Sequence, residues 1–238
     1  TLIPIIADWY ERLPTDRKWL LRGVKLGWEA GIGYNAFYYP DGNSYLERWP
    51  KDPSHDPTYG LKLGEGLDGG CVQLGYASLK AAGIKSSGEL TRDDLAKLTY
   101  EYLSVLCRKA NFLGLPKELI ITHMGGNYAP WDVHIPAWPA MNEWSTPGYS
   151  FYWQDPRELG DFPKELTTAG RKEWAASEWW WPGQTAEAWR NHFERTLSFE
   201  DCQFLVVYNW NPGVFSQGLP AQQGLKQLFA TWRRPVPH

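Results

Sequence analysis

The chain has 238 residues, a formal net charge of −3 and no long run of charges of one sign. This length favours a single domain over residues 1–238 with a sizeable core, and the charge pattern excludes the basic stripe of a nucleic-acid-binding surface. No apolar stretch is long enough to span a bilayer. The chain begins without Met and without the basic region and cleavage site of a signal peptide. Its compartment is therefore not fixed by the sequence, with a secreted or periplasmic location favoured.

Tryptophan is unusually abundant, with 15 residues. The indole is large and keeps a polar N–H. Some of these side chains must form the core. The surplus clusters near the ends of predicted strands, and that placement is typical of aromatic platforms on which sugar rings stack.

The cysteines and histidines predict no metal site. Cys71, Cys107 and Cys202 are widely spaced, odd in number and without a C-x-x-C pair, so we expect buried free thiols. The five histidines show no metal-ligand spacing. No cofactor is predicted.

The first half of the chain predicts helices around one strand and one long loop. Residues 5–21 have helical spacing, interrupted at Pro14, and a strand is expected over 22–29. Residues 30–68 are rich in Gly, Pro, Asp, Asn and Tyr, which predicts a long ordered loop. A helix is expected over 70–82.

The clearest helix of the sequence is predicted over 92–112. Thr91 is a good N-cap, and Asp93 and Asp94 suit the positive end of the helix dipole. Apolar residues recur at helical spacing up to Ala110, and Gly114 then stops the helix.

The second half of the chain alternates strands with helices. Strands are expected at 119–123, 149–153, 174–178 and 203–210, a long loop at 124–147, one or two helical turns at 163–170, and helices at 185–197 and 221–232. Such alternation favours an α/β fold. The strands are short and largely apolar, as parallel strands covered on both faces are.

Functional-looking side chains fall at the carboxyl ends of these strands. They are Glu29, His123, Tyr152, Glu178, Asn209 and Trp210. In a (β/α)8 barrel the active site is built at this end of the sheet. A carboxylate among indoles at a strand end is costly unless it has a partner or a role. Two of them, Glu29 and Glu178, suggest the paired carboxylates that cleave glycosidic bonds.

The chain resembles the later part of a clan-A retaining glycoside hydrolase, a (β/α)8 barrel whose acid/base Glu ends strand four and whose nucleophile Glu ends strand seven. Gly27-Trp28-Glu29 would end strand four and Ser177-Glu178-Trp179 strand seven, with two strands between them. Tyr152 would match the tyrosine that hydrogen-bonds the nucleophile. Tyr208-Asn209-Trp210 would end strand eight, where an aromatic platform lies under the reactive sugar.

The resemblance implies that Glu29 is the acid/base, that Glu178 is the nucleophile kept ionised by Tyr152 or His123, and that a β-linked saccharide is cleaved with retention. It also implies that barrel strands one to three are missing here. Five strands cannot close such a barrel, and an open sheet exposes unpaired edges. We therefore expect a partner chain or an N-terminal segment to complete it.

Several further side chains are candidate substrate contacts. They are Trp28, Tyr34, Asn35, His123, Asn127, Trp131, Glu143, Tyr152, Trp179, Asn209 and Trp210. Glu143 also competes for the acid/base role, because Asn142-Glu143 carries the Asn-Glu pair of the clan. Only one strand separates it from Glu178, however, which leaves too little chain for two further βα units.

Two rival functions stay open. Trp28 stands where the clan has Asn before the acid/base, which favours a non-catalytic carbohydrate-binding protein with a hydrolase-like barrel. Turnover of aryl glycosides would separate that protein from an enzyme. A structural α/β scaffold is the second rival, and failure to bind any glycan would support it.

Overall fold

The computed structural model describes residues 2–30, 79–85, 91–125, 136–152, 155–158, 162–181, 183–208 and 218–231. The expected loop at 30–68, nearly all of the helix expected at 70–82 and Cys71 lie outside these ranges. The chain divides into two compact units. The first comprises Thr1–Ala30, Tyr100–Tyr128 and Pro136–His238, and the second Gly31–Thr99 and Ala129–Ile135. The single domain expected from the length stays a prediction.

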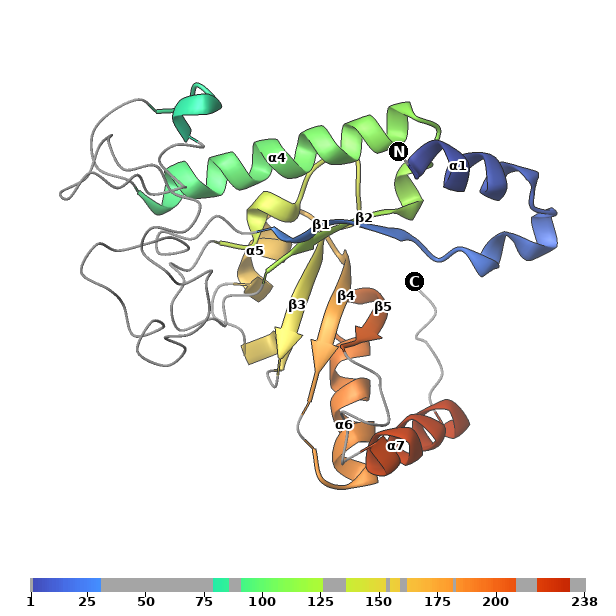
Figure 1. The fold of residues 1–238 in the computed structure, drawn as a ribbon. Helices are drawn as coiled ribbons and strands as arrows, with labels where there is room; N and C mark the ends of the chain where they lie inside the picture. The colour runs from blue at the N-terminus through green and yellow to red at the C-terminus, as the bar shows by residue number, and fades with distance from the viewer. Residues whose placement is uncertain are drawn as a thin grey trace, which may run out of the picture. The chain divides into compact units, whose positions relative to one another are not determined.

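The first unit is built on a five-stranded sheet whose strands follow one another in chain order and are all parallel (Figure 1). The strands are β1 (Val24–Ala30), β2 (Ile120–Met124), β3 (Gly148–Tyr152), β4 (Glu173–Trp180) and β5 (Asp201–Val207). The five predicted strands and the α/β class are thus confirmed. Because every connection returns to the next strand in the same direction, all carboxyl ends lie at one edge of the sheet.

Among the described residues, the longer helical segments accompany the sheet. They are α1 (Ile3–Arg12), the 3-10 helix η1 (Thr15–Leu20), α4 (Arg92–Phe112), α5 (Phe162–Thr168), α6 (Ala186–Leu197) and α7 (Gly218–Thr231). Pro14 separates α1 from η1, as the sequence predicts. Thr185 caps α6, because its side chain accepts a hydrogen bond from the Ala188 N–H at 3.1 Å. Within the described residues, none of the helices is both long and apolar enough to cross a membrane.

The start of α4 is held by a charged cap. The Asp94 carboxylate accepts hydrogen bonds from the backbone N–H of Thr91 at 3.0 Å and from its hydroxyl at 2.8 Å. The Thr91 hydroxyl in turn accepts from the Asp94 N–H at 3.2 Å. Lys85 donates to the same carboxylate at 2.6 Å. The bond from Lys85, followed by that from Thr91, lowers the pKa of Asp94 to about 2.

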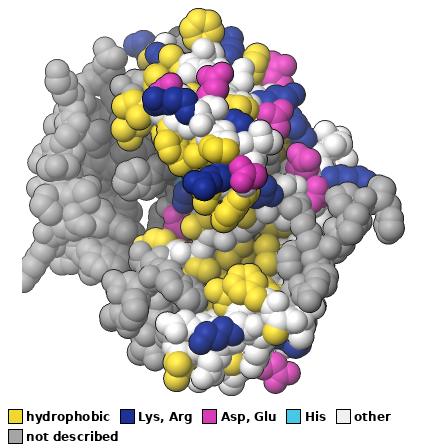
Figure 2. All heavy atoms as spheres, turned by 90° about the vertical axis from the view of Figure 1, so that its right-hand side faces the viewer, with side chains coloured by type: hydrophobic (Ala, Val, Ile, Leu, Met, Phe, Trp, Pro, Cys, Tyr) yellow, Lys and Arg dark blue, Asp and Glu magenta, His cyan; other side chains and the backbone are white. Residues whose placement is uncertain are grey.

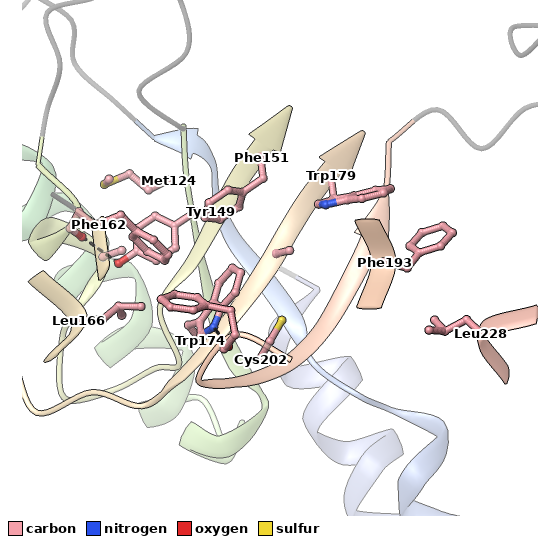
Figure 3. Close-up of a cluster of buried hydrophobic side chains, with 14 of the residues drawn as sticks. Met124, Tyr149, Phe151, Phe162, Leu166, Trp174, Trp179, Phe193, Cys202 and Leu228 are labelled. Carbon is pink, nitrogen blue, oxygen red and sulfur yellow. Dashed lines mark hydrogen bonds between the residues drawn. The ribbon is translucent and has the colours of Figure 1, made fainter. Parts of the chain in front are cut away.

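Aromatic side chains fill the layer between the sheet and α5 and α6 (Figure 3). Trp174 on β4 lies edge-on to Phe151 on β3 at 5.1 Å and to Phe162 at the start of α5 at 5.4 Å. Further along β4, Trp179 stacks on Phe193 of α6 at 4.8 Å. These residues are buried, so these Trp and Phe side chains form core on the helix-facing side of the sheet.

A second core cluster joins α4 to β2 and contains Cys107, Ala110, Leu115, Leu119 and Ile120. Cys107 and Cys202 are both buried, and the Cys107 thiol is free, as predicted. Burial raises the pKa of the Cys107 thiol.

The sheet is strongly curled. The Lys25 ammonium on β1 donates to the carbonyl of Ser177 on β4 at 2.9 Å, and Arg22, just before β1, donates to Gln203 on β5 at 3.3 Å. In a flat sheet β1 would lie about 14 Å from β4 and about 19 Å from β5, farther than these side chains reach. The two bonds therefore cross the concave inner face.

Large apolar side chains are exposed at the two ends of this array, and also on α4 at Tyr102, Val105 and Phe112. Leu2, Ile5, Trp9, Trp19 and Leu20 belong to the N-terminal end, and Val206, Tyr208, Leu219 and Phe229 to the C-terminal end. Figure 2 shows hydrophobic side chains gathered among charged ones on the face turned to the right in Figure 1. Exposed apolar groups at both ends of a βα array are typical of units that stack on further units.

Candidate active site

A β-bulge positions Glu178 at the carboxyl end of β4. Tyr149 on β3 pairs with Ala176, and the next residue, Ser150, pairs with Glu178. Ser177 is therefore the extra residue of β4. A bulge redirects the side chains that follow it and is common beside active sites.

The Glu178 carboxylate lies among side chains from two neighbouring strands. The Tyr152 hydroxyl, at the end of β3, donates a hydrogen bond to Oε1. His123, near the end of β2, places Nε2 at 3.8 Å from Oε2. The Glu178 side chain keeps 14% of its surface exposed, whereas that of His123 keeps 4%. The carboxylate is thus both held by partners and open to an incoming ligand.

Tyr152 is oriented by its strand and by β5. Ser150 and Tyr152 stand two residues apart on β3, so their side chains point to the same face of the sheet. The Tyr152 ring lies edge-on to Tyr208, directly after β5, at 5.9 Å. The hydroxyl is therefore directed at Glu178 by a fixed ring.

The histidine does not belong to a Ser-His-acid triad. His123 Nε2 lies 2.9 Å from the Ser150 hydroxyl and also faces Glu178. A triad needs the nucleophile on one ring nitrogen and the acid on the other, and here a single nitrogen faces both. Ser150 is also fully buried. The chemistry that the site can perform therefore centres on the carboxylate.

Glu29 lies within a second bulge, near the carboxyl end of β1. Leu26 pairs with Thr122 and Ala30 with Met124, so β1 carries extra residues between these pairs. Gly27 makes the bulge possible, because its φ is +115° and an added Cβ would lie 3.0 Å from the His123 carbonyl oxygen. The backbones of Glu29 and Glu178 thus share the carboxyl edge of one sheet, and the Glu29 side chain lies outside the described residues.

No family model, curated protein or solved structure matches this chain. The geometry at the carboxyl edge of the sheet is therefore the ground on which a function is inferred.

Two candidate contacts are placed elsewhere by the structure. Trp179 is fully buried against α6, where its indole N–H donates to Thr196 at 3.1 Å; it is a core residue, because the bulge turns it to the helix side. Glu143 is exposed in a turn before β3. Its neighbour Asn142 accepts from Arg171, just before β4, so Glu143 lies at the amino edge of the sheet, opposite to Glu178.

The other candidates lie outside the described residues. They are the side chain of Trp28 and the residues Tyr34, Asn35, Asn127, Trp131, Asn209 and Trp210. Across the described ranges, no cluster of three or more His, Cys, Asp or Glu side chains is arranged to hold a metal ion.

Sequence reasoning missed Lys25 and Ser150. Lys25 is a charge inside an apolar strand, and Ser150 is a small polar residue in an aromatic one. Each interrupts the pattern of its strand, and that interruption is the signal that marks them.

Proposed function

We propose that this chain is a glycoside hydrolase that cleaves a β-linked saccharide with retention, using Glu178 as nucleophile and Glu29 as acid/base. The observation that carries the proposal is the setting of Glu178. Its partly exposed carboxylate follows a bulge at the carboxyl edge of a parallel sheet, accepts a hydrogen bond from Tyr152 and lies beside His123.

A nucleophilic carboxylate must be ionised and correctly aimed. A hydrogen bond donated to a carboxylate stabilises its charged form, and Tyr152 supplies that bond. Glu178 would attack the anomeric carbon while Glu29 gives its proton to the leaving oxygen, forming a covalent glycosyl-enzyme. Glu29 would then take a proton from the water that releases the sugar.

The finer fold in this proposal is a (β/α)8 barrel, with β1 to β5 as its strands four to eight. Support comes from the chain order of the parallel strands, from the curl that lets Lys25 and Arg22 reach across, and from the exposed apolar residues at both ends. The three remaining strands would come from another segment or from a partner chain.

The proposal is tested with Glu178→Gln, assayed on aryl β-glycosides in protein produced in its natural host, so that any completing segment is retained. We expect turnover to fall by about 10³-fold or more while folding is unchanged, because the amide cannot form the glycosyl ester. Glu173→Gln is the matched control, since Glu173 is exposed at the far end of the same strand.

Full turnover in Glu178→Gln would refute the nucleophile. Glycan binding by the unaltered protein without turnover would instead support the non-catalytic carbohydrate-binding reading.

A further inference from the structure

A lysine reaches across the inner face of the sheet to the bulge beside Glu178. Lys25 stands on β1, three strands away, and its half-buried ammonium donates to the Ser177 carbonyl at 2.9 Å. Ser177 is the extra residue of the β4 bulge, and its carbonyl belongs to the peptide unit that contains the Glu178 N–H. The ammonium is therefore one peptide unit from the backbone of Glu178, the candidate nucleophile.

The bulge explains why a donor is needed there. An extra residue in a strand is left out of the regular ladder, and a buried carbonyl without a donor costs free energy. The Ser177 hydroxyl is already used, because it donates to the Thr122 carbonyl at 3.1 Å. Lys25 supplies a charge-assisted bond, which is stronger than a neutral one.

A neutral side chain would also satisfy a carbonyl, at a lower cost of desolvation. The positive charge of Lys25 gains a further interaction if a negative charge lies close by. Glu178 provides that negative charge, one residue along the strand. The placement of a half-buried cation on a bulge carbonyl, one residue along the strand from a carboxylate, thus has a physical reason that a neutral donor would lack.

We propose that Lys25 is a positioning residue for Glu178, which fixes the bulge that aims the carboxylate and favours its ionised form. The consequence for turnover rests on the proposed function, but the structural role does not. In the described part of the chain, the titratable groups Tyr152 on β3 and His123 on β2 face Glu178, and Tyr208 after β5 packs behind Tyr152.

The experiment compares Lys25→Met, Lys25→Gln and Lys25→Arg. The titration of the Glu178 carboxylate is followed by NMR with ¹³C-labelled glutamate, and its signal is assigned by its loss in Glu178→Gln. We expect the midpoint to move to higher pH by about half a unit or more in the Met and Gln variants, because an adjacent positive charge is removed. The Arg variant should restore it.

The kinetic profile gives a second readout on aryl β-glycosides. The acidic limb of the pH profile of kcat/KM should move to higher pH, as the midpoint does. We also expect kcat to fall by about 10-fold with little change in KM, because the orientation of the Glu178 carboxylate is lost while substrate binding is kept. Lys18→Met is the matched control, because Lys18 lies in η1 and donates to the Tyr10 carbonyl.

The outcomes separate this inference from the proposed function. A folded Met or Gln variant with an unchanged Glu178 midpoint overturns the role of Lys25, whatever the activity. Equal losses in the Met and Arg variants also overturn it, because charge would then not matter. Absence of turnover with a shifted midpoint overturns the hydrolase and leaves the positioning role supported.

Discussion

At the scale of single residues, the hydrogen bond from Tyr152 to Glu178 is the contact on which the proposed chemistry most depends. It joins two neighbouring strands at the edge where their carboxyl ends meet. Tyr149 lies on the same strand but points to the helix side, where its hydroxyl donates to the Ala137 carbonyl at 2.9 Å. The strand therefore offers one tyrosine in the site and one in the core.

This pair gives a matched prediction. Tyr152→Phe removes the hydrogen bond that orients the Glu178 carboxylate, so kcat/KM should fall by roughly 10- to 100-fold, in addition to any loss of stability. Tyr149→Phe should cost about 1 kcal/mol of stability and leave kcat/KM near that of the unaltered protein. Steady-state kinetics and urea unfolding measure both. Equal kinetic losses in the two variants would contradict the assignment.

At the scale of elements, patterns along the sequence predicted most of the architecture. The limits of α4 were predictable because Thr91 caps its start and Gly114 follows its end. The strands were recognisable as short apolar runs, and their ends differ from prediction by no more than three residues. Local chemistry determines each of these features.

The bulges were not predictable, and they explain the errors at the candidate site. An extra residue shows only when strands are paired, and it reverses which side chains face inward from that point on. The Ser177 bulge therefore decides that Glu178 faces the site and Trp179 the core. The contact of Lys25 with Ser177 was equally hidden, since 152 residues separate the two in sequence.

The cap of α4 predicts a pH dependence of stability. The pKa of Asp94 is lowered to about 2 from 3.8. The folded state therefore stabilises the ionised form of this carboxyl group. Its contribution is present above pH 3.8 and is lost as the pH falls through about 2. Allowing for partial solvent screening, Asp94→Asn should lose roughly 1 kcal/mol at pH 7 and almost nothing at pH 2.

Urea unfolding at several pH values measures this difference. Asp93→Asn is the control, because Asp93 makes an exposed pair with Lys97 at 2.6 Å and the variant should change stability by no more than about 0.5 kcal/mol. A pH-independent difference between Asp94→Asn and the unaltered protein would contradict the role of the charge.

At the scale of the whole molecule, the exposed apolar residues at the two ends of the βα array predict association. A chain whose ends stay uncovered should self-associate at micromolar concentration, because such surfaces favour contact with another apolar surface. Leu219→Ser combined with Phe229→Ser should weaken this association, since both side chains are more than 60% exposed on α7. Analytical ultracentrifugation over a concentration series measures it.

Val105→Ser is the control, because Val105 is exposed on α4, between the two ends in chain order. Equal weakening by this variant would show that the ends have no special role. A sedimentation coefficient independent of concentration would contradict the prediction altogether.

The long side chains that cross the inner face also limit how a ligand travels. Lys25 pairs with Ile121, two residues before His123 on the same strand, so its ammonium spans the interior one layer beneath the carboxylate. Arg22 and Gln203 join beneath it again. Together these side chains cross the inner face of the sheet on the amino side of Glu178. In the proposed hydrolase, a saccharide would therefore reach Glu178 from the carboxyl edge of the sheet, and both products would leave by that same edge.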